Sequence, residues 1–154
     1  MNRFQNVIFG QKAFIVKGDK LLIVKRKDVD ILSGIWDVPG GKLENTDSLS
    51  EGLAREVNEE TGLNLVRIRL IISTSKFVGR VGDHPTIFRN IYLCTAEGKV
   101  QLSKEHSEFK WIKLDKIDQY RFPDEDDFQA SLKKLPEIVN AMTTKTDVIL
   151  SEIF

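Results

Sequence analysis

The chain has 154 residues and a mass of 17.6 kDa, and 41% of its residues are hydrophobic, which is enough for one substantial core. We therefore expect a single domain over residues 1–154. The 23 basic residues balance 23 acidic ones, which excludes a strongly basic surface for nucleic acid, and we expect no nucleic-acid partner. No segment approaches the roughly 18 apolar residues of a membrane span, so the sequence predicts a soluble, cytoplasmic protein without a membrane partner.

The N-terminal part of the chain favours paired strands. Residues 14–17 and 20–24 are rich in aliphatic and β-branched side chains, and they flank Gly18-Asp19, a pair suited to a tight hairpin turn. Residues 35–38 resemble a third, short strand. We expect Pro39-Gly40-Gly41 to end the pairing there, because proline has no N–H to donate and glycine weakens a strand.

A helix is predicted over residues 48–61. Ser48 and Glu51 have the spacing of a capping box at its start, and Gly62 tolerates the left-handed conformation that follows a last helical turn. Leu53 and Val57 belong to an apolar stripe that can anchor this helix on a core.

The second half of the chain predicts three more strands and a final helix. The strands cover residues 66–77, 87–96 and 109–114. Cys94 falls in the second of them and is expected to be a small buried residue rather than a nucleophile. Apolar residues recur at helical spacing from Phe128 to Met142, but Pro136 should break this helix into two pieces. Strands on both sides of a helix indicate an α/β fold with a mixed central sheet.

Three glutamates form the most informative cluster. Glu56, Glu59 and Glu60 are related by the spacings i, i+3 and i+4, which place them on one face of the predicted helix. Their charges repel, so a cation is needed nearby, and carboxylates grouped in this way suit Mg²⁺ or Mn²⁺ bridging to phosphates. The alternative from spacing alone is a solvated acidic helix end.

The wider sequence around this cluster resembles the box of the Nudix hydrolase family. The box has a glycine, five residues, a glutamate, seven residues, and then Arg-Glu-aliphatic-X-Glu-Glu-X-Gly-aliphatic. Eight of its nine positions match here, and the ninth holds Asp47 in place of glutamate. The nine positions are Gly41, Asp47, Arg55, Glu56, Val57, Glu59, Glu60, Gly62 and Leu63. The segment from Trp36 to Glu44 is also typical of the family, whose fold is an α/β/α sandwich.

The resemblance implies an enzyme that hydrolyses a phosphoanhydride bond with the help of Mg²⁺ or Mn²⁺. It assigns Glu56, Glu59 and Glu60 to the metal or its water, with the carbonyl of Gly40 as a further ligand. It gives Arg55 the task of orienting these carboxylates through charge-assisted hydrogen bonds. The shorter side chain of Asp47 leaves the outer ligand position of the box open to question.

Family members differ in the glutamate that accepts the proton of the attacking water. Glu56 and Glu59 are options on the helix, and some members use a glutamate from a loop after the later strands. Here Glu105 is the first choice in that loop and Glu108 the second. The alternative for both is a solvated turn.

Three arginines are predicted to bind the substrate. Arg26 ends the second strand, just before the loop that leads to the box, where it can meet a phosphate. Arg80 and Arg89 flank a glycine-rich loop, with Phe77 and Phe88 as base-stacking partners. The alternatives are a solvated strand end for Arg26 and core positions for the two aromatic residues.

The substrate class follows by elimination. The chain lacks the additional signatures of Nudix enzymes for ADP-ribose, coenzyme A and NADH. By elimination it resembles the MutT-like group, which implies nucleoside triphosphates, oxidised ones included, cut to a nucleoside monophosphate and pyrophosphate. Nucleotide sugars remain an alternative. A second alternative is a Nudix-like sensor that binds a nucleotide without cutting it, although the presence of all three glutamates disfavours that reading. The sequence leaves open whether the chain forms a homodimer.

Overall fold

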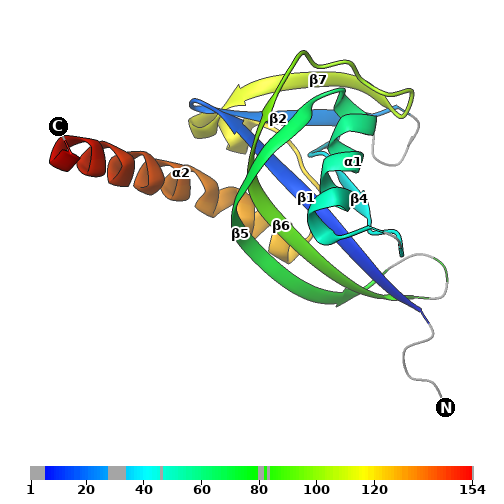
Figure 1. The fold of residues 1–154 in the computed structure, drawn as a ribbon. Helices are drawn as coiled ribbons and strands as arrows, with labels where there is room; N and C mark the ends of the chain where they lie inside the picture. Colours follow the sequence, from blue (N-terminus) through cyan, green and yellow to red (C-terminus); the bar gives the residue numbers. More distant parts are fainter. Residues whose placement is uncertain (1–5, 28–33, 46, 80–81, 83, 154) are drawn as a thin grey trace.

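In the computed structural model, residues 6–27, 34–45, 47–79, 82 and 84–153 are described, with side chains up to residue 143. Seven strands form one sheet in the order β3-β2-β1-β6-β5, with β4 pairing to β1 and β7 to β2 (Figure 1). The strands are β1 (Val7–Lys17), β2 (Lys20–Arg26), β3 (Trp36–Asp37), β4 (Gly40–Lys42), β5 (Asn64–Val78), β6 (Thr86–Glu97) and β7 (His106–Lys113). The helices are α1 (Leu49–Thr61), the 3₁₀ helix η2 (Leu114–Gln119) and α2 (Asp126–Ile153).

Strand β1 is the centre of the sheet. It pairs antiparallel with β2 through the predicted turn, in which Gly18 has a φ of 61°. It pairs parallel with β6, from Val7 opposite Thr86 to Ile15 opposite Cys94. The other strand pairs are antiparallel, so the predicted mixed sheet is confirmed.

The prediction that pairing ends at Pro39 was wrong. Pro39 does separate β3 from β4, but Gly40 and the next two residues then pair with β1. Pro39 lacks only its own N–H, and its carbonyl still accepts a hydrogen bond of 2.8 Å from the Ala13 N–H. The absence of a side chain permits the close approach, since a Cβ on Gly40 would lie 2.9 Å from the Cα of Lys12.

The predicted caps of helix α1 are confirmed. The Ser48 hydroxyl accepts a hydrogen bond from the Glu51 N–H at 3.2 Å, and the Glu51 carboxylate accepts one from the Ser48 N–H at 3.3 Å. At the other end Gly62 has a φ of 72° and donates its N–H to the Asn58 carbonyl. These bonds satisfy helix-end groups and fix where α1 starts and stops.

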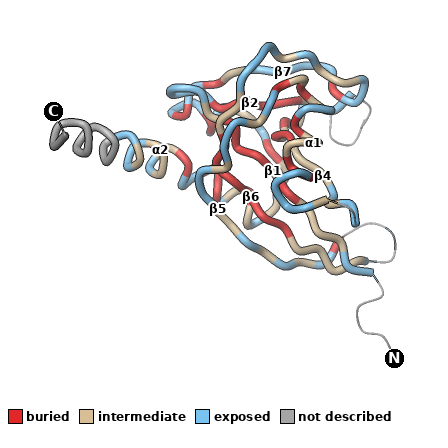
Figure 2. Tube along the Cα trace, in the orientation of Figure 1, coloured by how far each residue is buried: buried red, intermediate tan, exposed pale blue. Residues whose placement is uncertain are grey.

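The two helices cover opposite faces of the sheet. On one face, Leu53 and Val57 of α1 pack with Ala13, Ile15 and other buried residues. On the other, the first half of α2 packs Phe128, Leu132 and Leu135 against the sheet. Figure 2 shows these buried segments as red stretches running through the middle of the sheet. Helices on both faces of a mixed sheet agree with the predicted sandwich.

The predicted break at Pro136 was wrong, because α2 continues through this residue. A proline inside a helix leaves one carbonyl without its usual N–H donor, which costs stability but does not by itself separate the two halves. Leu135 is fully buried just before the proline, and Val139 packs against the same core just after it. Burial on both sides of Pro136 therefore holds the helix together.

No helix in the described part of the chain is long and apolar enough to cross a membrane.

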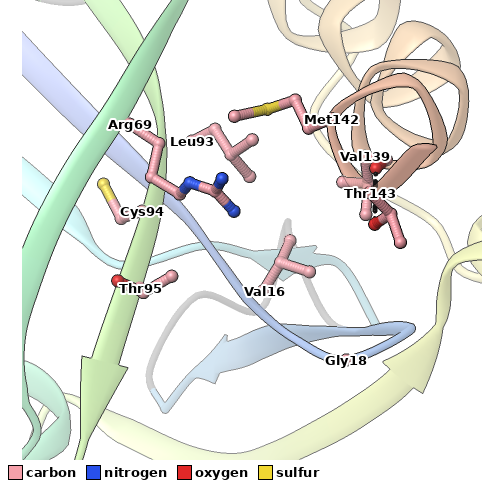
Figure 3. A pocket seen from close by; sticks show the side chains of 9 residues that line it. All are labelled: Val16, Gly18, Arg69, Leu93, Cys94, Thr95, Val139, Met142 and Thr143. Atoms are coloured by element: carbon pink, nitrogen blue, oxygen red, sulfur yellow. Dashed lines mark hydrogen bonds between the residues drawn. The ribbon is translucent and has the colours of Figure 1, made fainter. Parts of the chain in front are cut away.

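A cavity of about 220 Å³ lies where α2 passes over the C-terminal end of β1. Figure 3 shows the Arg69 side chain beside Leu93 and Cys94, opposite Met142 of α2. Cys94 is fully buried, as expected, and burial raises the pKa of its thiol to about 12. None of the residues predicted for the active site lines this cavity.

Candidate active site

Arg55 lies at the centre of the acidic face of α1, the helix face that carries Glu56, Glu59 and Glu60. Its Nη2 donates a hydrogen bond of 2.8 Å to Asp47, and its Nη1 lies 3.1 Å from Glu56, 3.3 Å from Glu59 and 3.5 Å from Glu44. The Nε atom is buried and has no hydrogen-bond partner among the described residues. One guanidinium therefore contacts four carboxylates, which leaves this face of the helix with excess negative charge.

The pKa values of this pair follow from its contacts. The hydrogen bond to Asp47, supported by the charges of Asp47, Glu44 and Glu56, raises the pKa of Arg55 despite partial burial. The same hydrogen bond from Arg55 lowers the pKa of Asp47. Both groups thus stay charged over the whole working pH range, and Arg55 remains a fixed cation within the acidic face.

Glu60 is the most buried of the three box glutamates. Its Oε2 accepts a hydrogen bond of 2.9 Å from the backbone N–H of Gly40 in β4. Burial, with smaller contributions from the charges of Glu56 and Asp37, raises the pKa of Glu60 to about 7. Burial also raises the pKa of Glu56. Both carboxylates are costly to hold as anions without a further cation.

Gly41 lets the helix carboxylate approach the sheet. A Cβ on Gly41 would lie 2.6 Å from the Cδ of Glu56, which is closer than any real contact of this kind. Gly41 is in register with Gln11 of β1, so the carboxylate of Glu56 rests on the backbone beside the central strand. Because the nearest atoms are the far end of a flexible side chain, a Cβ at this position would displace the Glu56 carboxylate rather than the backbone.

The acidic face fits a divalent metal in charge and in ligand type. Glu56 and Glu60 of α1 lie against the β4 backbone, with Glu59 one turn from Glu56 on the same helix face. Hard oxygen ligands with unbalanced negative charge suit Mg²⁺ or Mn²⁺. As the side chains stand, no three acidic, histidine or cysteine residues within the described part of the chain form a group that could hold a metal ion. Glu56 and Glu59 turn toward Arg55 and Glu60 toward Gly40, so metal binding would replace these partners. A metal that keeps several waters tolerates such an open site.

Backbone hydrogen bonds bring the predicted base loop to the C-terminal end of α1. The Ser103 N–H donates to the Glu60 carbonyl at 3.1 Å, and the Lys27 N–H donates to the Glu105 carbonyl at 2.9 Å. The Glu105 side chain is exposed. Glu108 lies farther along β7 and pairs with Lys25, with 3.5 Å between Nζ and Oε2. The loop thus connects α1 with the end of β2, where Arg26 lies.

Arg26 is the most accessible of the predicted substrate-binding arginines in the described part of the chain. It is exposed at the end of β2, in register with His106 of β7. Burial, and then the positive charge of Arg26, lower the pKa of His106, which also feels the charge of Glu105. Arg26 and Glu105 therefore both lie close enough to His106 for their charges to act on its pKa, in opposite directions. Arg80 lies outside the described residues.

Arg89 has a structural environment that the sequence did not indicate. Its guanidinium is buried, with Nη2 2.6 Å from Asp127 and Nη1 3.2 Å from Glu125, so that it ties β6 to the start of α2. The Phe77 ring lies 4.9 Å from the guanidinium carbon and is occupied by this contact. Phe88 is half-buried on the same strand. The substrate contacts predicted for Arg89 and the two aromatic residues would require them to share or exchange these partners.

Sequence reasoning missed the ion pair between Lys12 and Asp37. The two side chains lie 2.6 Å apart and are largely buried, Lys12 also lies over the Phe128 ring, and both charges act on Glu60. A signal was available, because Lys12 alternates with Phe14 and Val16 on the core-facing side of β1. A lysine in that register needs a buried partner.

Comparison with known proteins adds independent evidence. Residues 10–134 match the model of the NUDIX domain. The chain is 30% identical over 122 residues to an 8-oxo-dGTP diphosphatase from Buchnera aphidicola subsp. Schizaphis graminum, covering 79% of this chain and 86% of that protein. It is 27% identical over 113 residues to the nucleoside triphosphatase NudI from Klebsiella pneumoniae, covering 68% of this chain and 79% of that protein.

A solved structure points to the same family as the sequence relatives. The crystal structure of the MutT protein from Methanosarcina mazei Go1 superposes with a TM-score of 0.69 at 29% identity, covering 88% of this chain and 96% of that one. The acidic face of α1, β4 and the loop that carries Glu105 all fall within the part of the chain that matches the NUDIX domain.

Proposed function

This chain belongs to the NUDIX domain family and is a hydrolase of phosphorus-containing anhydrides in nucleotides, and we propose that its substrates are nucleoside triphosphates, oxidised ones included. The products are a nucleoside monophosphate and pyrophosphate. Two relatives support this class by name, one as an 8-oxo-dGTP diphosphatase and the other as a nucleoside triphosphatase. The proposed compartment is the cytoplasm, where such nucleotides are found.

The observation that carries the proposal is the uncompensated charge on α1. Arg55 is shared among four carboxylates, and Glu60 is buried with a backbone N–H as its hydrogen-bond donor. A divalent cation, Mg²⁺ or Mn²⁺, balances such a cluster and at the same time attracts a polyphosphate. A solvated acidic helix end would instead leave the Glu60 carboxylate exposed.

In the proposed site each residue has one task. Glu56, Glu59, Glu60 and the Gly40 carbonyl hold the metal and its water, and Arg55 keeps the carboxylates oriented. When bound, the metal supplies charge withdrawal from the phosphate oxygens and a lowered pKa for a coordinated water. The base that accepts the water's proton is one of the site's glutamates, with Glu105 the proposed choice in the loop.

Arg26 is the proposed phosphate contact. It is exposed, carries a fork of donors that matches phosphate oxygens, and is the last residue of β2, next to Lys27, whose N–H donates to the Glu105 carbonyl. An arginine that contacts a phosphate away from the bond being cut should contribute more to substrate binding than to the chemical step. We expect Arg26→Met to raise KM more than it lowers kcat.

The function is tested by measuring pyrophosphate, phosphate and nucleoside monophosphate release from nucleoside triphosphates, 8-oxo-dGTP, dinucleoside polyphosphates and nucleotide sugars, with Mg²⁺ or Mn²⁺. Glu59→Gln removes one proposed metal ligand, and Glu97→Gln is the control because Glu97 is an exposed glutamate at the far end of β6. We expect metal-dependent release from triphosphates that is lost only in Glu59→Gln. Turnover restricted to nucleotide sugars would overturn the substrate class, and nucleotide binding without any turnover would favour the sensor alternative.

The choice of base is tested separately. Glu105→Gln should lower kcat by about 100-fold and flatten the acidic limb of the pH–rate profile, whereas Glu108→Gln should leave both unchanged. Equal effects of the two substitutions, or none from Glu105→Gln, would return the role of base to a glutamate on α1.

A further inference from the structure

A chain of side-chain hydrogen bonds crosses the sheet beneath α1. The Thr74 hydroxyl on β5 donates to the Asn90 carbonyl oxygen at 2.8 Å, and the Asn90 amide donates to the Tyr92 hydroxyl at 3.0 Å. Tyr92 donates in turn to the Gln11 Oε1 at 2.7 Å. The Gln11 amide ends the chain on the backbone carbonyl of Leu49, at 2.9 Å. We call these hydrogen bonds the polar relay; it joins β5, β6 and β1 to the first residue of α1.

The relay has only one consistent direction. The Tyr92 hydroxyl has a single hydrogen, which it gives to Gln11, and it therefore accepts from Asn90. If the Gln11 amide were flipped, its oxygen would face the Leu49 carbonyl, and two acceptors would repel each other. Each donor thus has its acceptor, and the orientation of the Gln11 amide is fixed by both neighbours.

The central members of the relay are buried. Gln11, Asn90 and Tyr92 are 3%, 7% and 4% exposed, and Tyr92 belongs to the apolar cluster that includes Leu53 and Val57 of α1. Buried polar groups are expensive to leave unpaired, so a break at one member is not repaired by solvent. The relay therefore holds α1 against the sheet with a defined geometry that apolar packing alone does not impose.

Gln11 connects this relay to the acidic face of α1. Its backbone is in register with Gly41, on which the Glu56 carboxylate rests, and its side chain grips the start of the helix. The opposite end of α1 is held by the bond from Gly40 to the Glu60 carboxylate and by the bond from Ser103 to the Glu60 carbonyl. Gln11 thus contacts both elements: its backbone pairs with β4, and its side chain binds the first turn of α1.

We propose that Gln11 and Tyr92 are positioning residues: through the polar relay they fix α1 relative to β4, and so place Glu56 and Glu60 to bind the divalent metal. This rests on the proposed metal site, but not on any particular nucleotide substrate. Neither residue touches the metal or the substrate. Their effect on metal affinity passes through the backbone of α1 and β4.

The test measures Mn²⁺ binding in the absence of substrate. Free Mn²⁺ is quantified from its electron paramagnetic resonance signal. Tyr92→Phe keeps the ring and removes the hydroxyl, and we expect it to weaken Mn²⁺ binding about tenfold, the range of substitutions that orient metal ligands indirectly. Gln11→Met removes the member that contacts α1 and should act in the same way, which keeps the test informative if one variant does not fold. Tyr120→Phe is the matched control, because Tyr120 packs on Trp36 and lies outside the relay.

Ile91→Val distinguishes a positioning role of the relay from a general loss of stability. Ile91 is fully buried next to Tyr92 but faces the α2 side of the sheet, so this variant lowers the Tm without touching the relay. We expect Mn²⁺ affinity to be unchanged in Ile91→Val and reduced in Tyr92→Phe. Equal loss in both, or wild-type affinity in both Tyr92→Phe and Gln11→Met, would overturn the proposal.

A second readout follows α1 itself. The Gly52 N–H bonds to the Ser48 carbonyl in the first turn, and its hydrogen exchange should quicken about tenfold in Tyr92→Phe while the Gly62 N–H at the C-terminal end is unaffected. Wild-type protein that binds Mn²⁺ but hydrolyses none of the nucleotide panel would overturn only the proposed substrate. Wild-type protein that binds no Mn²⁺ would overturn the relay's proposed effect on metal.

Discussion

The carboxylate of Asp47 accepts a hydrogen bond from Arg55, with 2.8 Å between Oδ2 and Nη2. The shorter aspartate reaches the guanidinium because the loop that precedes α1 lies close to the helix over Gly52. A Cβ on Gly52 would be 3.2 Å from the Cβ of Asp47 and 2.6 Å from a methyl carbon of Leu43. The methylene missing from Asp47 is thus compensated by the backbone, and the residue orients Arg55.

Replacing Asp47 by alanine should disturb the metal site without removing a proposed ligand. Arg55 would lose its shortest contact and shift toward Glu56 and Glu59, so we expect kcat/KM to fall by roughly 10- to 100-fold. Asp47→Glu restores the family residue and should keep activity within about threefold. Steady-state kinetics on the best substrate check this. Wild-type activity in Asp47→Ala would show that Arg55 needs no such partner.

Gly41→Ala should inactivate the enzyme while leaving the fold intact. The new methyl group would collide with the Glu56 carboxylate and push it away from β4, so we expect kcat to fall by about 100-fold or more. Gly10→Ala is the control on the partner strand, because a Cβ there meets only ordinary contacts of 3.8 Å with Arg89. Circular dichroism should show both variants folded. Similar activity in the two variants would contradict the close approach.

Asp127 should contribute to stability at neutral pH and lose that contribution in acid. Burial opposes its ionisation, but hydrogen bonds from Arg89 and Ser75 and the charge of Arg89 outweigh burial and lower its pKa. Because the folded pKa lies below the unfolded value, the contribution is present above about pH 4 and disappears as pH falls through the folded pKa. We expect Asp127→Asn to cost about 3 kcal/mol at pH 7.

Urea unfolding of Asp127→Asn and wild type between pH 7 and pH 3 measures this difference. The two curves should approach each other below pH 4. Asp124→Asn, at an exposed position in the same segment, should follow the wild type throughout. A constant difference between Asp127→Asn and wild type at all pH values would mean that the carboxylate charge contributes nothing.

Pro136→Ala should stabilise the protein. Alanine restores the N–H that a helix interior uses, at the cost of greater freedom in the unfolded chain, and we expect a net gain of about 1–2 kcal/mol in the free energy of unfolding. Glu137→Ala, one residue later and exposed, should change stability by less than about 0.5 kcal/mol. Chemical denaturation compares the two. A loss of stability in Pro136→Ala would mean that the proline ring itself packs productively.

The elements that were predicted well are those with local signals. The caps of α1 depend on Ser48, Glu51 and Gly62, whose chemistry is read within a few residues, and they lie where predicted. The hairpin at Gly18 is local as well. By contrast, the prediction that β1 begins at residue 14 was late by seven residues, because its first half is stabilised by β4 and β6 and not by its own composition.

The features that were missed depend on contacts between distant segments. Pairing of β4 with β1 follows from glycines that permit close approach, and continuity of α2 follows from burial on both sides of Pro136. The ion pair of Lys12 with Asp37 joins two strands that are not paired with each other. Box residues were found because the family pattern records their spacing, whereas the polar relay leaves no spacing signal along the chain.

The parallel pairing of β1 with β6 has a consequence for how the protein folds. Val7 meets Thr86, and the whole of β4, α1 and β5 lies between them in the sequence. The loop must close before this pairing forms, and such nonlocal contacts slow folding. Gln11, which contacts the start of α1, lies inside the stretch of β1 that pairs with β6. The local hydrogen bonds of α1 can therefore form early, while the part of the sheet against which α1 packs is still incomplete. Catalytic competence during refolding should then lag behind helix formation.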